Sequence, residues 1–185
     1  MIFFSDKNYT EAVNAFYNAT IYDKKNRLAW YYHGKSLYHL KEYDKANASF
    51  NEAANLGYFK AWNDIGLILS KNGKYGQATK AYDYYLSNES SDNDIVWYNK
   101  GIAYNFTGDY NMSVNSFDEA IWINPSYVNA WLGRGNALYN LKEYNQSIIS
   151  YNRTLELDEN NENALKGQNN VLKIFNDTHI IYKSM

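Results

Sequence analysis

The chain contains no cysteine and a single proline among its 185 residues. Without cysteine it has no disulfide framework, no cysteine-ligated zinc or iron–sulfur site and no thiol nucleophile. Its 18 lysine and arginine residues against 20 aspartate and glutamate residues lack the basic excess typical of a nucleic-acid-binding protein. No apolar run approaches the roughly 20 residues that a membrane helix needs. We therefore expect neither nucleic acid nor a membrane among its partners.

Aromatic residues and asparagine are abundant instead. The chain has 20 tyrosines, 8 phenylalanines and 5 tryptophans, which together make up 18% of its residues, and it has 27 asparagines. So high an aromatic content is not typical of a disordered chain, and the length is sufficient for a buried core.

Four of the tryptophans recur at a nearly fixed period, because Trp30, Trp62, Trp97 and Trp131 are 32, 35 and 34 residues apart. A glycine follows each of them after four residues, a large apolar residue after seven, a tyrosine after thirteen, a small residue after sixteen and an aromatic residue after twenty. In that order, the matched sets are Gly34, Gly66, Gly101 and Gly135; Leu37, Leu69, Tyr104 and Leu138; Tyr43, Tyr75, Tyr110 and Tyr144; Ala46, Ala78, Ser113 and Ser147; and Phe50, Tyr82, Phe117 and Tyr151.

These spacings predict two short helices in each unit. The offsets 0, 4 and 7 follow the 3.6-residue helical period, and so do 13, 16 and 20 after a break. In the first complete unit they place one helix at Leu28–Leu40 and a second at Tyr43–Asn55. The glycine four residues after each tryptophan allows the second helix to approach closely, and the small residue at offset sixteen accommodates that approach. The expected fold class is all-α.

The pattern resembles the tetratricopeptide repeat family, whose units are 34-residue helix–turn–helix modules with these residue types at these offsets. The fullest copy consists of Trp97, Gly101, Tyr104, Gly108, Tyr110, Phe117, Ala120 and Pro125. The resemblance implies a right-handed α-solenoid, a superhelix of antiparallel helix–turn–helix repeats, and it covers nearly the whole chain.

The same register predicts the domain organisation. We expect a single solenoid over residues 1–185, with a partial repeat at 1–26, full repeats at 27–58, 59–93, 94–127 and 128–161, a capping helix at 162–176 and a tail at 177–185. The first repeat begins halfway, with Met1–Asp6 as the end of one helix and Lys7–Tyr22 as the next. This start fits either a segment of a longer repeat protein or a true start with a half-unit. An exposed half-unit favours self-association through that end of the array.

Catalytic and metal-binding motifs are absent from the sequence. His33 and His39 are six residues apart on one predicted helix, whereas chelation on a helix requires a spacing of three or four. There is no phosphate-binding glycine loop, dinucleotide fingerprint or nucleophile elbow. The sequence therefore predicts a protein that is not an enzyme and has no cofactor or metal.

The resemblance also implies a concave groove lined by the first helix of each repeat. Its inward positions lie one, two, five and eight residues after each tryptophan, and tyrosine and asparagine dominate them. The candidate peptide-binding residues are Tyr31, Lys35, Tyr38, Asn63, Tyr98, Asn99, Asn105, Asn136 and Tyr139. Asparagine both donates and accepts hydrogen bonds, and tyrosine adds contact area, so these residues favour a peptide ligand. The alternative is a merely solvated inner face.

Lys35 is the one charged residue at offsets one, five and eight, with Lys60 and Lys71 as further cations near these positions. Chaperone-binding members of the family clamp a C-terminal carboxylate with several lysines and arginines, so the composition disfavours that ligand. The leading hypothesis is a non-catalytic protein–protein interaction module that acts as a scaffold or adaptor. The alternative is a regulatory or substrate-docking segment of a larger enzyme or surface glycoprotein. An RNA-binding helical repeat ranks last, because the groove positions are not basic.

The asparagines also form nine Asn-x-Ser/Thr sequons, whereas chance pairing of 27 asparagines with 19 serines and threonines gives about three. The excess favours a secreted or surface glycoprotein, although Ser113, Ser147 and Thr154 occupy packing positions of the repeat. The sequence leaves a cytoplasmic and an extracellular location open.

Overall fold

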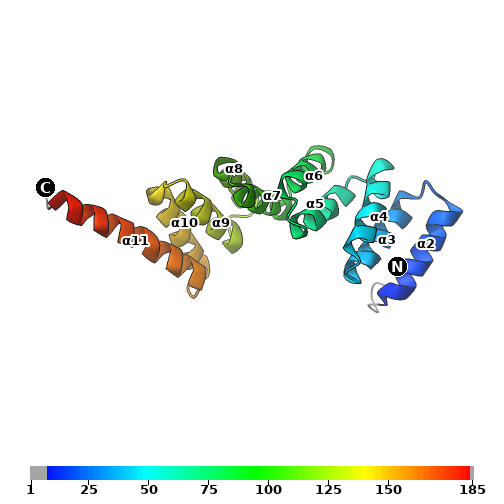
Figure 1. The fold of residues 1–185 in the computed structure, drawn as a ribbon, viewed down its shortest axis with the longest axis horizontal. Coiled ribbons are helices and arrows are strands. Elements are labelled where there is room, and N and C mark those ends of the chain that lie inside the picture. Colours follow the sequence, from blue (N-terminus) through cyan, green and yellow to red (C-terminus); the bar gives the residue numbers. More distant parts are fainter. Residues whose placement is uncertain (1–7, 184–185) are drawn as a thin grey trace. The chain divides into compact units, whose positions relative to one another are not determined.

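A computed structural model describes residues 8–183 of the chain, with side chains over residues 8–177. Within these residues the fold is all-α, as predicted, and contains ten helices and no strand (Figure 1). None of the described helices is long and apolar enough to cross a membrane. The expected helix end at Met1–Asp6 lies outside the described residues. The helices are α2 (Tyr9–Tyr22), α3 (Arg27–His39), α4 (Tyr43–Asn55), α5 (Ala61–Lys71), α6 (Tyr75–Asn88), α7 (Asp94–Thr107), α8 (Tyr110–Ile123), α9 (Val128–Asn140), α10 (Tyr144–Leu157) and α11 (Glu162–Lys183).

The helix boundaries of the first complete repeat agree closely with those expected from the sequence. The second helix of the first complete repeat spans Tyr43–Asn55 as predicted, and its first helix, Arg27–His39, is displaced by one residue from the prediction. Several helices begin after an asparagine whose side-chain oxygen accepts a hydrogen bond from a backbone N–H of the first turn. Asn26 accepts from Ala29 at 3.0 Å and Asn93 from Val96 at 3.1 Å. Such caps satisfy N–H groups that have no partner inside the helix.

The turn between the two helices of each repeat contains one residue in the left-handed backbone conformation. Gly73 and Gly108 adopt it in two repeats, with φ of 72° and 85°. In the other two turns lysine takes this conformation, at Lys41 and Lys142 with φ of 64° and 63°. Glycine suits the position because it has no Cβ to clash with the neighbouring carbonyl.

The last helix is longer than predicted. The sequence places the end of the capping helix at Asn176 and a tail at 177–185, but α11 continues to Lys183. No glycine or proline lies between residues 177 and 183, so no residue there stops the helical hydrogen-bond ladder. The prediction of a tail from residue 177 was therefore wrong.

The chain divides into two compact units between Ser91 and Asp92, in the loop that follows α6. Unit 1 contains α2 to α6, and unit 2 contains α7 to α11 (Figure 1). In each unit, consecutive helices pack side by side as helix–turn–helix pairs. In unit 2 the first helix α9 also contacts the first helices of the neighbouring repeats, α7 and α11. The chain thus consists of two compact units, and a single solenoid over the whole chain stays a prediction.

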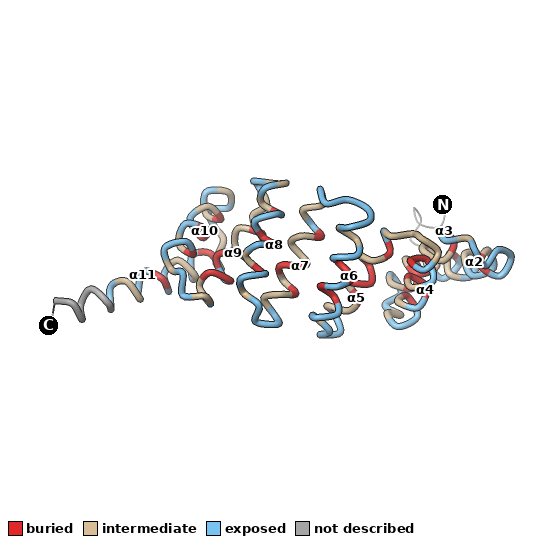
Figure 2. Tube along the Cα trace, turned by 90° about the horizontal axis from the view of Figure 1, so that it is seen from above, coloured by how far each residue is buried: buried red, intermediate tan, exposed pale blue. Residues whose placement is uncertain are grey.

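At the centre of each repeat, a buried aromatic ring on the second helix packs against a glycine on the first helix. Phe50, Tyr82, Phe117 and Tyr151 are at most 2% exposed. Figure 2 shows the buried stretches of the chain, in red, among the helices of each unit. A Cβ built on the glycine of the same repeat would lie 2.5–2.8 Å from the ring in every case. These distances are shorter than real Cβ contacts, so the ring can occupy this place only because the facing residue is glycine.

Polar groups support the same packing. Ser113 and Ser147 replace alanine at the small position, and each donates a hydrogen bond of 2.8 Å to the carbonyl of its repeat's glycine, Gly101 or Gly135. The indole N–H of Trp131 donates to the carbonyl of Pro125 at 2.9 Å. The tryptophan thereby ties its helix to the loop that joins two repeats.

The glycine–aromatic contact yields a stability prediction. Gly66→Ala places a Cβ 2.5 Å from the buried Tyr82 ring, so we expect the free energy of unfolding to fall by about 1–3 kcal/mol. The matched control is Gly76→Ala in α6, where no heavy atom lies within 4 Å of the new Cβ. We expect that variant to be unchanged or up to about 1 kcal/mol more stable, because alanine is the better helix former. Urea unfolding measures both, and equal stability of the two variants would contradict the assignment.

Candidate functional site

The nine predicted peptide-binding residues all lie on the first helices of their repeats. In unit 1, α3 carries Tyr31, Lys35 and Tyr38, and α5 carries Asn63. In unit 2, α7 carries Tyr98, Asn99 and Asn105, and α9 carries Asn136 and Tyr139. Asn136 is exposed and the other eight are partly buried.

Two of these residues pack within their own repeat. The Tyr31 ring lies 5.7 Å from that of Phe50 and 4.6 Å from that of Tyr58. Tyr98 repeats this arrangement in unit 2, at 5.8 Å from Phe117 and 5.0 Å from Tyr127. Both tyrosines therefore extend the aromatic core toward the surface, a structural role that the sequence pattern did not indicate.

A buried carboxylate joins α3 to α5 in unit 1. Asp64, on α5, is 5% exposed, and its Oδ1 lies 3.2 Å from Nζ of Lys35 on α3. The Tyr31 hydroxyl also donates a hydrogen bond to this carboxylate. Burial raises the pKa of Asp64 above its ordinary value, against the lowering effect of Lys35 and of the hydrogen bonds. Lys35 is thus one member of an ion pair and not an isolated cation.

Three of the other predicted residues, Tyr38, Asn63 and Asn105, lie in local surroundings within their own units. Tyr38 packs at 5.3 Å against Tyr43, whose ring lies 4.9 Å from the ammonium of Lys71. The side-chain oxygens of Asn63 and Asn105 are buried and accept no hydrogen bond. These amides therefore retain acceptor capacity that the chain itself does not use.

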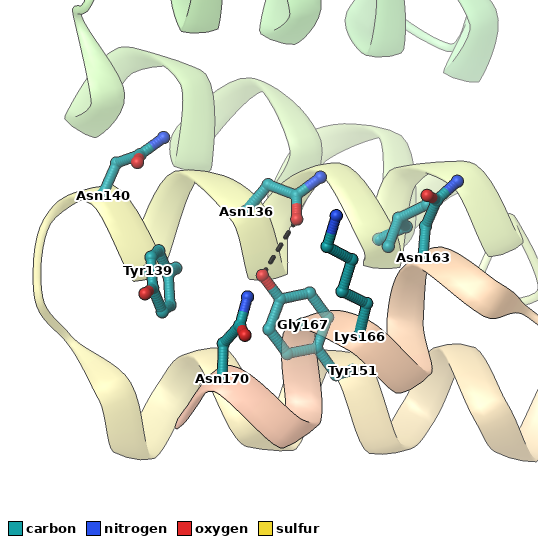
Figure 3. A pocket seen from close by; sticks show the side chains of 9 residues that line it. Asn136, Tyr139, Asn140, Tyr151, Asn163, Lys166, Gly167 and Asn170 are labelled. Carbon is teal, nitrogen blue, oxygen red and sulfur yellow. Dashed lines mark hydrogen bonds between the residues drawn. The ribbon is translucent and has the colours of Figure 1, made fainter. Parts of the chain in front are cut away.

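Asn136 and Tyr139 do come together, in a pocket of unit 2 with a volume of about 480 Å³ (Figure 3). The pocket lies between α9 and α11. Figure 3 shows the Lys166 side chain of α11 between Asn136 and Asn163. The full lining is Leu132, Asn136, Tyr139, Asn140, Tyr151, Asn163, Lys166, Gly167 and Asn170.

Asparagine amides dominate this pocket, and one of them is held in place. The hydroxyl of Tyr151 donates a hydrogen bond of 2.9 Å to Oδ1 of Asn136, which leaves the amide N–H groups of Asn136 to donate elsewhere. The Tyr151 ring itself lies in the core, so the bond connects the pocket to the packing beneath it. Asn140, Asn163 and Asn170 are exposed and add further donors and acceptors.

The histidines and acidic residues form no metal centre within the described residues, where no three potential metal-ligating side chains lie together. Nδ1 of His33 lies 2.9 Å from the Ser49 hydroxyl, and the His39 ring stacks on Tyr9 at 4.3 Å. Both described histidines thus have packing or hydrogen-bonding partners.

The sequons coincide with packing positions more often than the sequence alone indicated. In five of the nine sequons the hydroxyl residue is buried, namely Thr20, Ser49, Ser113, Ser147 and Thr154. Each of the five hydroxyls donates a hydrogen bond to a backbone carbonyl. The repeat therefore selects small hydroxyl residues for its own packing, which accounts for part of the sequon excess. Glycosylation stays a prediction.

Comparison with known proteins assigns the family. Models described as tetratricopeptide repeat match residues 2–61, residues 59–87 with 95–127, and residues 128–161. Together they leave only residues 88–94 unmatched between residues 2 and 161. The chain belongs to the tetratricopeptide repeat family. Among curated proteins, no sequence matches it significantly.

Solved tetratricopeptide repeat structures share its fold at low sequence identity. YrrB, described as a TPR protein with an unusual peptide-binding site, is 14% identical with a TM-score of 0.82 over 91% of this chain and 87% of its own. MamA from Desulfovibrio magneticus RS-1 is 17% identical with a TM-score of 0.78 over 86% and 91%. The first TPR of Spaghetti (RPAP3), solved with an HSP90 peptide, is 24% identical with a TM-score of 0.61 over 63% and 92%.

The sequence pattern did not indicate the contribution of α11 to the pocket or the burial of Asp64. Lys166 and Asn170 lie one and five residues after Leu165, which matches the tryptophan position in α11. The inward-position rule would have found them had it been extended to the capping helix. Asp64 lies two residues after Trp62, at one of the predicted inward positions, but its burial and its pairing with Lys35 depend on contacts between repeats.

The raised pKa of Asp64 predicts a pH dependence of stability. Between the ordinary carboxyl pKa of about 4 and the higher folded value, the folded chain binds this proton and the unfolded chain does not. The contribution of Asp64 to the free energy of unfolding therefore increases as the pH falls through that window. We expect the wild type to gain stability relative to Asp64→Asn between neutral pH and about pH 4. Urea unfolding at several pH values measures this difference, and a constant difference would refute the prediction.

Proposed function

We propose that this tetratricopeptide repeat chain is a non-catalytic protein-interaction module that binds a peptide segment of a partner on the faces of its first helices. The observation that carries the proposal is the pocket between α9 and α11. It is large enough for several peptide atoms, and its lining includes two of the residues that the sequence predicts for ligand binding, Asn136 and Tyr139.

The chemistry of the pocket suits a peptide backbone. Every peptide unit has one N–H donor and one carbonyl acceptor, and an asparagine side chain carries both complementary groups. Four asparagines line the pocket, and Asn136 is oriented in advance by Tyr151. A group that is already positioned loses less conformational entropy on binding. Leu132 and Tyr139 supply apolar surface for a ligand side chain.

Related structures support the same kind of ligand. The first TPR of Spaghetti (RPAP3) is bound to an HSP90 peptide, and YrrB is described as having a peptide-binding site. We extend the proposal to a scaffold or adaptor role, in which unit 1 offers Lys35, Tyr38 and Asn63 as a second contact face. Self-association through an end of the array stays part of this proposal.

A capture experiment with matched asparagine variants tests the proposal. The pocket variant is Asn140→Ala/Asn163→Ala/Asn170→Ala, which removes three exposed amides that line the pocket. The control variant, Asn111→Ala/Asn115→Ala/Asn145→Ala, removes three exposed amides from α8 and α10. Tyr31, Tyr98 and Asn136 remain intact because they also support the packing.

We expect the wild type and the control variant to capture the same partner from a lysate of the native source, as identified by mass spectrometry. The pocket variant should bind this partner at least about tenfold more weakly, because each lost hydrogen bond contributes about 0.5–1.5 kcal/mol. Equal capture by all three proteins would show that the pocket is not the binding site. Thermal melts confirm that each variant is folded.

A further inference from the structure

The position two residues after each tryptophan is charged in one repeat only. It is occupied by Tyr32, Asp64, Asn99 and Gly133 in the four complete repeats. In unit 2, a Cβ on Gly133 would lie 2.5 Å from the Phe117 ring of the preceding repeat, so the position faces its neighbour. Asp64 also faces the preceding repeat, through Lys35 and Tyr31 of α3. Because neutral residues fill this place elsewhere, the fold of the repeat does not itself require a carboxylate here.

Nor does stability explain the charge. The Asp64 carboxylate is almost completely buried, and the loss of hydration disfavours its ionised form. The free energy lost when two charges are removed from water is commonly as large as the free energy gained from their attraction. Asparagine has nearly the same size and could accept the Tyr31 hydrogen bond without the cost of burying a charge. The negative charge therefore has an effect beyond packing, and its nearest cation is Lys35.

The Lys35 side chain is accessible to a ligand, but the carboxylate of Asp64 balances its positive charge. Its side chain is 30% exposed, whereas that of Asp64 is 7% exposed. It is also the one cation among the inward residues at offsets one, five and eight after the four tryptophans. An anionic ligand that approaches the Lys35 ammonium also approaches the Asp64 carboxylate 3.2 Å away, so attraction and repulsion largely cancel.

We propose that Asp64 is a specificity-determining residue, which neutralises Lys35 so that the face formed by α3 and α5 admits uncharged peptide segments and discriminates against acidic ones. The proposal rests on the peptide-binding function proposed above and names its ligand class on unit 1. Rejecting a wrong ligand by an opposing charge is as effective for specificity as adding contacts to the right one.

The test measures peptide affinity by fluorescence anisotropy at low salt. The acidic probe is SRMEEVD, the HSP90 peptide bound by the first TPR of Spaghetti (RPAP3). The neutral probe has the same sequence with its acidic side chains converted to amides, its arginine replaced by glutamine, its N-terminus acylated by the fluorescent label and its C-terminus amidated, so that it carries no charge. The proteins are the full chain as wild type, Asp64→Asn, Lys35→Met and the double variant Asp64→Asn/Lys35→Met.

We expect Asp64→Asn to bind the acidic peptide at least about fivefold more tightly than the wild type, or to bind it measurably where the wild type does not. The gain should disappear in the double variant and decrease with added salt, because it depends on one exposed ammonium. Lys35→Met should bind the acidic peptide no better than the wild type. The neutral peptide should show no gain with any variant.

Two outcomes overturn the proposal: an unchanged affinity of Asp64→Asn for the acidic peptide, or a gain that persists in the double variant. A purely structural role of Asp64 would change the affinities for both peptides together and would not depend on Lys35. Should Asp64→Asn fail to fold, Lys35→Met decides alone, and tighter binding of the acidic peptide by this variant would refute the proposal. The asparagine variants of unit 2 test the proposed function separately, because they leave Asp64 and Lys35 intact.

Discussion

The contact between a glycine and an aromatic ring is the constraint on which the rest of the structure depends. In each complete repeat, the aromatic ring twenty residues after the tryptophan packs against the glycine four residues after it. Any other residue at the glycine position would place its Cβ too close to this ring. In unit 2 the constraint is doubled, because Phe117 contacts Gly101 and Gly133, and Tyr151 contacts Gly135 and Gly167. Each of these rings is thus held between glycines of two successive first helices. Close packing of this kind sets the distance between repeats and leaves little freedom for adjustment.

The same constraint shapes the candidate site. Because the aromatic rings fill the interior, the opposite faces of the first helices are available for other contacts. Tyr151 belongs to both regions, with its ring between two glycines and its hydroxyl on Asn136 in the pocket. The pocket therefore has a rigid base, although its remaining asparagines are exposed. Preorganisation of this kind favours binding, because fewer side chains must be ordered when the ligand arrives.

Charge is distributed differently in the two units. In unit 1 the Lys35 ammonium is paired with a buried carboxylate, whereas Lys166 extends into the pocket of unit 2 without a carboxylate among the lining residues. Repeats that share one fold thus present different electrostatic surfaces. The residues that build the core and those that face a ligand occupy separate positions of the repeat, so the surface can change while the packing is kept.

The sequence by itself determined the repeat, the helix pairs and the core positions. These follow from local spacing, since glycine, aromatic and small residues recur at fixed offsets and the helical period places them on one face. It also predicted Asn136 and Tyr139 as ligand-binding residues, and both line one pocket. Only the tertiary structure decided that Tyr31 and Tyr98 pack against neighbouring rings, that Asp64 is buried against Lys35, and that α11 completes a pocket with α9. The tyrosine contacts depend on how the two helices of one repeat pack together, and the ion pair and the pocket depend on which side chains of successive repeats meet. Spacing along the chain does not specify either.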